Sequence, residues 1–170
     1  MESGDLTIDD GREEDIDEIV AIERDSFPNP WSADLFHKEI SLPISRLIVG
    51  RGLQEGRSFV AGYIVYWRVA DEMQLHTIAT RRDLRRHGIA SRLLAEAVGR
   101  SRSEGARSLI LEVRRSNLPA QKFYGKLGLS VKGVRTGYYT DTREDALIMA
   151  TDLDKFLDNG GSSCCEKGNG

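Results

Sequence analysis

The chain has 170 residues, enough for one domain with a single core, and its 39% hydrophobic and 30% charged residues are typical of a globular protein. Its formal net charge of −3 excludes binding of nucleic acid through overall charge, so any basic function is local. No window reaches the roughly 18 apolar residues of a membrane span. The polar, acidic start "MESGDLTIDD" lacks the pattern of a signal peptide. We therefore expect a cytoplasmic protein that does not enter a membrane.

Cysteine and histidine usage predicts neither a disulfide framework nor a metal site. The only cysteines, Cys164 and Cys165, are neighbours and cannot join distant parts of a fold, which suits a reducing compartment. His37, His76 and His87 lie in three different predicted elements, without the spacing of metal ligands. We expect no metal.

The N-terminal third predicts one strand and two helices. A short strand is expected at residues 6–10, and residues 12–27 carry apolar side chains at helical spacing, with acids at the start. Pro28 and Pro30 end this helix. Ser32 is a good N-cap for a second helix within residues 31–40.

The remaining elements alternate between strands and helices. Strands are predicted at 45–51, 58–70 and 72–80, a helix at 89–103 ended by Gly105, a strand at 108–113, a helix at 117–128, and two antiparallel strands at 130–139 and 145–153. The strand at 108–113 is almost continuously apolar, as is typical of a strand buried on both faces.

This order predicts an α/β (α+β) fold with one central mixed sheet. The strand–helix–strand segment from Glu72 to Val113 implies a right-handed crossover between parallel strands. We assign residues 1–156 to a single domain. The segment 157–170 is Gly/Ser-rich without an apolar period, so we expect a disordered tail.

The stretch "RRDLRRHGIASRLL", residues 81–94, concentrates arginines in front of an apolar helix. Gly88 allows close backbone approach, and the free N–H groups at a helix start carry the positive end of the dipole. These features predict a cradle for a pyrophosphate. A basic helix start exposed to water explains the stretch equally well. Neither a Walker loop nor a dinucleotide fingerprint is present.

The pattern Arg85-x-x-Gly88-x-Ala90 between a strand and a helix resembles the acyl-coenzyme A loop of the GCN5-related N-acetyltransferases (GNAT). Four more stretches resemble the bacterial ribosomal-protein-alanine (RimI) group: "FPNPWS" at 27–32, "LHTIAT" at 75–80, "LEVRRSNLPAQKFYGKLG" at 111–128 and "YYTDTREDALIMA" at 138–150. The shorter Phe-Pro-Trp-Ser form common in the family is interrupted here by Asn29-Pro30. The resemblance implies a GNAT fold with about seven mostly antiparallel strands and about four helices.

The resemblance also implies that acetyl-CoA is the cosubstrate. The backbone of Ile78, Ala79 and Thr80 would then hold the pantetheine arm. The pyrophosphate would lie on the loop and helix start formed by Arg85, Arg86, His87, Gly88, Ile89, Ala90 and Ser91. Asn117 is a natural helix cap, and in the resembling family it also contacts the coenzyme.

Glu112 and Tyr124 are the candidate catalytic residues. A carboxylate in an otherwise apolar strand is unusual, and a general base that acts through water explains it. The alternative is an edge Glu that points to solvent or pairs with Arg114 or Arg115, although strand alternation weakens pairing with Arg115. Tyr124 is either a core aromatic beside Phe123 or the acid that protonates the leaving thiolate, the role that the resemblance favours.

Five aromatic and proline residues are candidates for the acceptor groove: Phe27, Pro28, Trp31, Tyr138 and Tyr139. Simple packing of two loops explains each of them about as well. Acidic residues near both loops, Asp34, Glu39, Asp141, Glu144 and Asp145, are able to attract a basic peptide, although a solvated charged face explains most of them.

The resemblance implies an N-terminal protein acetyltransferase that transfers acetyl directly in a ternary complex. The implied acceptor is the N-terminal alanine of a small-subunit ribosomal protein, without direct binding of nucleic acid. Acetylation of a lysine, a polyamine or an antibiotic is the near alternative. A binding module for RNA or the ribosome and a catalytically inactive CoA sensor are the alternatives from other classes.

Overall fold

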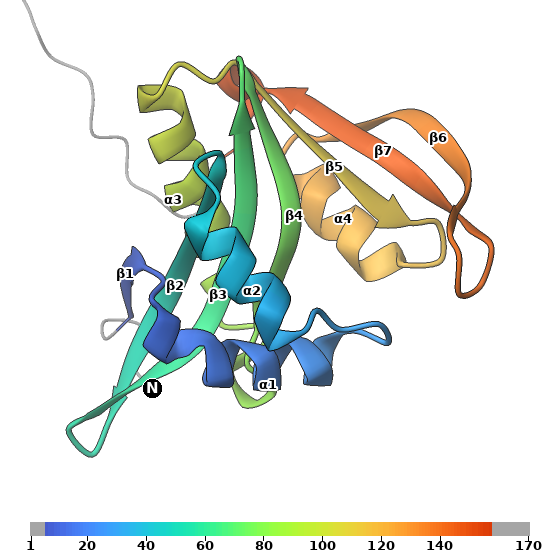
Figure 1. Ribbon diagram of the computed structural model, residues 1–170. Helices are drawn as coiled ribbons and strands as arrows, with labels where there is room; N and C mark the ends of the chain where they lie inside the picture. Colours follow the sequence, from blue (N-terminus) through green and yellow to red (C-terminus); the bar gives the residue numbers. More distant parts are fainter. Residues whose placement is uncertain (1–5, 158–170) are drawn as a thin grey trace, which may run out of the picture.

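The computed structural model describes residues 6–157, which form a seven-stranded sheet with helices on both faces (Figure 1). The strand order is β1-β2-β3-β4-β5-β7-β6. The strands are β1 (Thr7–Asp10), β2 (Ser45–Gln54), β3 (Arg57–Val69), β4 (Glu72–Thr80), β5 (Ser108–Arg114), β6 (Ser130–Tyr139) and β7 (Glu144–Asp152). β4 and β5 are parallel and every other neighbouring pair is antiparallel, so the predicted mixed sheet is confirmed.

Four α-helices cover the sheet: α1 (Ile16–Ser26), α2 (Ala33–Ser41), α3 (Ile89–Ser103) and α4 (Leu118–Lys126). The predicted caps are present, because Ser32 and Asn117 each accept a hydrogen bond from a backbone N–H of the first turn of α2 and α4. Short 3-10 turns lie at Glu13–Asp15, Arg82–Leu84 and Leu153–Lys155, and none of them was predicted.

Side-chain alternation along β3 divides the interior into two cores. Tyr63 and Val65 pack with α1 and α2 on one face of the sheet. Ile64 belongs to the core on the other face, which also contains the buried residues of α3 and α4. Figure 1 shows α1 and α2 in front of the first strands, with α3 behind the sheet. None of the described helices combines the length and apolar character needed to cross a bilayer.

The sheet opens between its two parallel strands. β4 pairs with β5 only from Glu72 to Leu75, whereas β4 continues to Thr80 and β5 to Arg114. Beyond Leu75 and Leu111 the strands separate, and Figure 1 shows them diverging toward the α1–α2 side. The free ends of both strands therefore face each other across the opening.

The prediction that 108–113 is buried on both faces was wrong. Leu109, Leu111 and Val113 are buried against α3 and α4, but Glu112 and the other alternate residues are only half-buried. The reason is that helices cover only one face of β5, while Glu112 on its other face lines the cavity where the sheet opens. The predicted tail is outside the described residues apart from Leu157, so the domain boundary at residue 156 stays a prediction.

Candidate functional site

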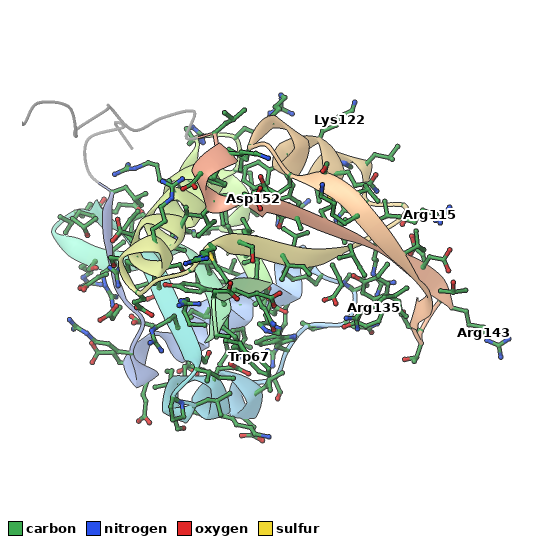
Figure 2. The ribbon with its side chains drawn as sticks, turned by 90° about the horizontal axis from the view of Figure 1, so that it is seen from above. Trp67, Arg115, Lys122, Arg135, Arg143 and Asp152 are labelled. Carbon is green, nitrogen blue, oxygen red and sulfur yellow. The ribbon has the colours of Figure 1, made fainter. Side chains whose placement is uncertain are left out.

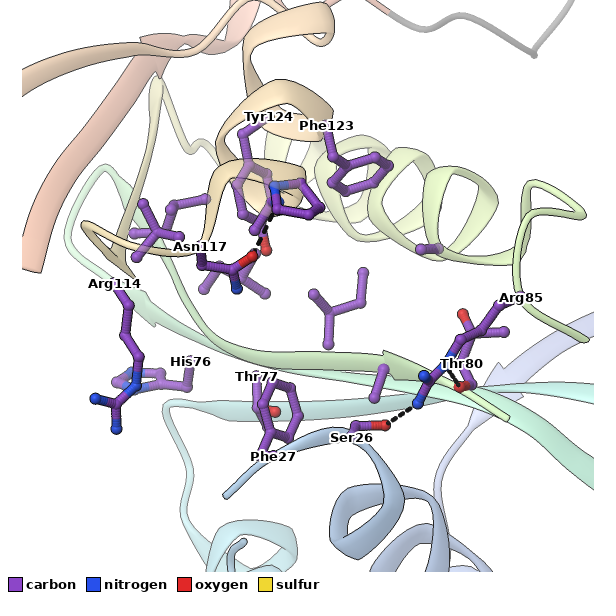
Figure 3. A pocket seen from close by; sticks show the side chains of 18 of the residues that line it. Ser26, Phe27, His76, Thr77, Thr80, Arg85, Arg114, Asn117, Phe123 and Tyr124 are labelled. Carbon is purple, nitrogen blue, oxygen red and sulfur yellow. Dashed lines mark hydrogen bonds between the residues drawn. The ribbon is translucent and has the colours of Figure 1, made fainter. Parts of the chain in front are cut away.

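A cavity of about 900 Å³ lies where β4 and β5 separate. Its walls come from the α1–α2 loop, the ends of β4 and β5, the start of α3, and α4 (Figure 3). Most predicted site residues line it: Phe27, Pro28, Trp31, Ile78, Ala79, Thr80, Arg85, Arg86, Gly88, Ile89, Ala90, Ser91, Glu112, Asn117, Tyr124 and Tyr139. His87 and Tyr138 do not line the cavity, because both side chains are exposed outside it.

One end of the cavity is the start of α3. Gly88 is the N-cap residue, in the left-handed conformation with φ of 76°, and no side chain caps the helix. A Cβ at Gly88 would meet nothing within 4 Å, so the space over this loop is open. The first turn contains no acidic residue. The positive end of the helix dipole is therefore available to an anion.

Arg85 holds this loop against α1. Its guanidinium donates to the backbone oxygens of Thr80 and Asp25, each at 3.3 Å, and to Oγ of Ser26 at 3.1 Å. Figure 3 shows Arg85 reaching toward Ser26 across the cavity wall. The side chain therefore positions the loop, in addition to supplying positive charge.

The end of β4 forms the floor between the two ends of the cavity. β3 pairs with Thr77 and with Leu75 but skips His76, so β4 carries a β-bulge at His76. From Thr77 to Thr80 the strand pairs with β3 but no longer with β5. Backbone groups on this edge therefore face the cavity instead of a neighbouring strand.

Glu112 lies on β5 with its side chain toward the cavity and 30% exposed. Its Oε1 is 3.3 Å from Nε of Arg135 on β6, and this pairing was not predicted. Neither arginine considered from the sequence is the partner, because Arg114 pairs with Asp141 and Glu144, and Arg115 pairs with Asp145.

Tyr124 projects from α4 into the same cavity, opposite β4 (Figure 3). Its side chain is 8% exposed and its ring lies 5.2 Å from that of Phe123, so it is also part of the core. Burial, with a smaller contribution from Tyr139, raises the pKa of the phenol well above its usual range. Tyr124 is therefore a protonated hydrogen-bond donor at neutral pH.

The other end of the cavity lies under two loops. Asn29 of the α1–α2 loop donates to Asp141 of the β6–β7 loop with a distance of 2.6 Å. Arg114 donates to the same carboxylate at 2.9 Å and lies 3.9 Å from the ring centre of Tyr139. Asp141 and Glu144 therefore neutralise an arginine at the cavity rim and do not form a freely solvated acidic face.

Sequence reasoning missed Glu23, a buried carboxylate that lines the cavity. It accepts hydrogen bonds from Tyr63, from Thr77 at 3.3 Å and from the backbone N–H of Trp31 at 3.0 Å. Burial raises its pKa, and the bonds from Trp31 and Thr77 only partly oppose this. The signal was present, because Glu23 falls on the apolar helical face between Val20 and Phe27.

His76 also lines the cavity without having been predicted as a site residue. Its ring lies 4.3 Å from that of Trp67. Partial desolvation lowers the pKa of His76, although the residue is exposed by surface area and Glu39 and Glu112 oppose the shift. Among residues 6–157, no three His, Cys, Asp or Glu side chains are grouped closely enough to hold a metal ion. The absence of a metal stays a prediction.

The comparison with protein families decides what kind of protein has this fold and cavity. Residues 16–129 match the model of the acetyltransferase (GNAT) family. The chain belongs to the GNAT family. The match includes the opening between β4 and β5, the start of α3, and α4, and it confirms the resemblance found in the sequence.

Two named relatives indicate to which group within the GNAT family the chain belongs. A Bacillus subtilis protein provisionally named as a ribosomal protein bS18-alanine N-acetyltransferase is 41% identical over 139 residues, covering 81% of this chain and 89% of the relative. The Escherichia coli ribosomal protein bS18-alanine N-acetyltransferase is 33% identical over 138 residues, covering 80% and 90%. The chain is an N-acetyltransferase of the RimI-like group.

Solved GNAT structures have the same fold. The crystal structure of the E. coli enzyme superposes with a TM-score of 0.76 at 31% identity, covering 87% of this chain and 94% of that one. Arabidopsis thaliana NAA60, solved in complex with acetyl-CoA, gives a TM-score of 0.77 at 17% identity, covering 88% and 99%. The second likeness concerns the fold alone.

Proposed function

We propose that this chain transfers acetyl from acetyl-CoA to the α-amine of an N-terminal alanine, in a ribosomal protein of the bS18 class. The main support is a single cavity that runs from an uncapped helix start to a loop-covered rim, with Glu112 and Tyr124 both on its wall. The names of the B. subtilis and E. coli relatives support the acceptor.

The residues of the cavity fit a coenzyme A group. The open space over Gly88 and the uncapped first turn of α3 accommodate a pyrophosphate, with Arg86 beside them. The unpaired edge of β4 at Ile78, Ala79 and Thr80 offers backbone hydrogen bonds to an extended amide arm. Asn117, Lys122 and Lys126 of the α4 segment also line the cavity. Acetyl-CoA supplies the acetyl group as an activated thioester.

Glu112 is the proposed general base. An N-terminal α-amine has a pKa of about 8, against about 10.4 for a lysine side chain, so a carboxylate acting through water suffices to remove its proton. Glu112 accepts that proton as the amine nitrogen bonds to the carbonyl carbon. Backbone N–H groups on the free edge of β4 stabilise the negative charge that develops on the carbonyl oxygen.

Tyr124 is the proposed general acid. Its raised pKa keeps the phenol protonated, so it donates to the sulfur as the carbon–sulfur bond breaks. The proton balance closes when Tyr124 is reprotonated from solvent and Glu112 releases its proton. The transfer is direct in a ternary complex, without a covalent enzyme intermediate. Cys164 and Cys165 lie outside the described residues.

The acceptor peptide enters from the loop-covered end of the cavity. Phe27, Pro28 and Trp31 line one side and Tyr139 the other, and they provide an apolar wall for the first residue. Tyr138 has its ring 5.2 Å from Tyr139 and extends this wall outside the cavity. The proposal includes a cytoplasmic site of action, where ribosomal proteins are made, and no direct contact with nucleic acid.

Mass spectrometry of synthetic peptides tests the acceptor. The protein is incubated with acetyl-CoA and an eight-residue peptide that begins with alanine and contains an internal lysine. We expect one acetyl group on the α-amine, and no product when that amine is blocked beforehand. Acetylation of the lysine or of the blocked peptide contradicts the proposal and favours the alternative amine acceptors.

The catalytic roles predict large losses in kcat. Glu112→Gln and Tyr124→Phe each remove one proton-transfer group and are expected to lower kcat about 10²-fold, with acetyl-CoA binding retained. Tyr66→Phe is the matched control for Tyr124, because Tyr66 is also a buried tyrosine but does not line the cavity. Unchanged kcat in either cavity variant would mean that the assigned residue has no role in proton transfer.

A further inference from the structure

Arg135 places a positive charge on the carboxylate proposed as the general base. It lies opposite Ala146 in the pairing of β6 with β7, and Ala146 lies opposite Arg114 of β5. Directly opposed residues share a face of the sheet, as do residues two apart in a strand. Arg135 and Glu112 therefore project from the same face, the one without α3 and α4. Figure 2 shows Arg135 on that side, toward α1 and α2.

The pairing with Glu112 is specific among the arginines of this region. Arg114 lies between Asp141 and Glu144, and Arg115 is 3.2 Å from Asp145. The ion pair of Arg135 in the described part of the chain is with Glu112, and its guanidinium also lies 5.6 Å from the ring centre of Tyr138. A cation thus already occupies the carboxylate to which an incoming ammonium is attracted.

An ammonium beside the same carboxylate repels the Arg135 guanidinium, so we expect Arg135 to move away when an acceptor arrives. The structure permits that movement. The Arg135 side chain is 55% exposed, and β6 is an edge strand whose pairing with β7 is irregular between Arg135 and Tyr139. Partly exposed ion pairs are weak, so acceptor contacts elsewhere in the groove are sufficient to displace it.

We propose that Arg135 is a displaceable counter-ion of Glu112, which competes with the α-ammonium of the acceptor and so lowers the affinity of the site for any amine that binds there. A small amine without groove contacts cannot compensate for the loss of the Arg135–Glu112 pair. A peptide that also contacts the groove can compensate for this loss. The inference rests on the proposed function, because it takes Glu112 as the carboxylate that attracts the α-ammonium before its proton is removed through water.

Calorimetry on the CoA-saturated enzyme tests the competition. The probe is an eight-residue peptide that begins with alanine and has a free α-amine. Arg135→Ala is expected to bind it about two- to fivefold more tightly than the unmodified protein, the range set by a partly exposed ion pair. Arg135→Lys keeps the charge and is expected to restore the weaker binding. Unchanged or weaker binding in Arg135→Ala overturns the inference.

Arg115→Ala is the matched control. Arg115 is 57% exposed and pairs with Asp145 at 3.2 Å, against 55% and 3.3 Å for Arg135 and Glu112. Its removal is expected to leave peptide affinity unchanged. Figure 2 shows Arg115 at the end of β5, separated from Arg135. Equal effects of both substitutions indicate general electrostatic attraction and contradict a specific counter-ion.

Two further measurements separate this inference from the proposed function. In a Glu112→Gln background, Arg135→Ala is expected to give no gain in affinity, because there is no carboxylate to release. The same peptide with an acetylated α-amine is also expected to show no gain. If the unmodified protein binds the free peptide but the gain in affinity also occurs in the Glu112→Gln background or with the acetylated peptide, the counter-ion role is contradicted and the proposed acceptor is not. If no variant binds the peptide, the proposed acceptor fails and the counter-ion role fails with it.

Discussion

Glu23 connects three parts of the structure through one buried carboxylate. It lies on α1 and accepts hydrogen bonds from Tyr63 on β3, Thr77 on β4 and the backbone of Trp31 before α2. The side chain is 2% exposed, and burial raises its pKa. A charge at this position is costly, because the carboxylate is almost fully withdrawn from water and no cation is paired with it among the described residues.

The raised pKa of Glu23 predicts a stability that depends on pH. A carboxyl group whose pKa is higher in the folded state binds its proton more tightly there, so its contribution is complete below its unfolded value of 4.5. That contribution is lost as the pH rises from 4.5 through the folded-state pKa. The free energy of unfolding of the native chain is therefore expected to fall relative to Glu23→Gln between pH 4 and pH 8.

Urea unfolding of both proteins at each pH measures this difference. The exposed Glu14→Gln is the control and is expected to show no comparable trend, because Glu14 lies 72% exposed at the surface. A constant difference between the native chain and Glu23→Gln across this range contradicts a raised pKa.

Individual residues differ in how far the sequence predicted them. Glu112 was identified as a carboxylate in an otherwise apolar strand, and Tyr124 was identified through a family resemblance. Both line the cavity. The pairing of Glu112 with Arg135 was not predictable, since it depends on the register of β5, β7 and β6. Residues 23 positions apart in sequence meet only after these three strands align.

At the scale of elements, the loops at the acceptor end are joined by a hydrogen bond from Asn29. Asn29 belongs to the Asn-Pro pair in "FPNPWS", and it donates to Asp141 of the β6–β7 loop at 2.6 Å. Arg114 fixes the same carboxylate from β5. The α1–α2 loop is thereby held to the outer half of the sheet, across the rim of the cavity.

Removing this hydrogen bond is expected to weaken acceptor binding alone. Asn29→Ala frees the α1–α2 loop from Asp141, so the apolar wall formed by Phe27 and Trp31 is less well positioned. We expect the KM for the alanine-initiated peptide to rise about fivefold, as for one hydrogen bond to a charged group near the surface. The KM for acetyl-CoA is expected to stay unchanged, because the start of α3 is at the other end of the cavity.

Steady-state kinetics with each substrate varied in turn measures both values. Lys38→Ala, on the exposed surface of α2, is the control and is expected to leave both unchanged. An equal rise in the two KM values for Asn29→Ala indicates a general loss of structure and contradicts a local role for the loop contact.

Most elements followed from sequence because their signals are local. Helical periodicity, the caps Ser32 and Asn117, and the turn residues Gly105 and Gly128 all agree with the structure. The β-bulge at His76 and the early end of the β4–β5 pairing were not predicted. Both depend on how neighbouring strands align, and a strand's own sequence contains no information about its neighbour's length.

At the scale of the whole molecule, the cavity separates the two halves of a continuous sheet. The half with β1 to β4 is packed on both faces, whereas the half with β5 to β7 leaves Glu112, Arg114 and most of β6 partly or fully exposed. The two halves share only four residue pairs between β4 and β5, from Glu72–Ser108 to Leu75–Leu111. A ligand that fills the opening contacts both halves and is therefore expected to stabilise the fold.

Acetyl-CoA is accordingly expected to raise the melting temperature. A ligand at about 100 times its Kd stabilises the folded state by about 2.7 kcal/mol. For a domain of this size each kcal/mol corresponds to about 2–4 °C, so a shift of about 5–10 °C is expected. Acetyl-pantetheine, which lacks the diphosphate, cannot use the start of α3 and is expected to shift the midpoint far less at the same concentration. Differential scanning calorimetry distinguishes the two ligands, and equal shifts would contradict a diphosphate site at Gly88.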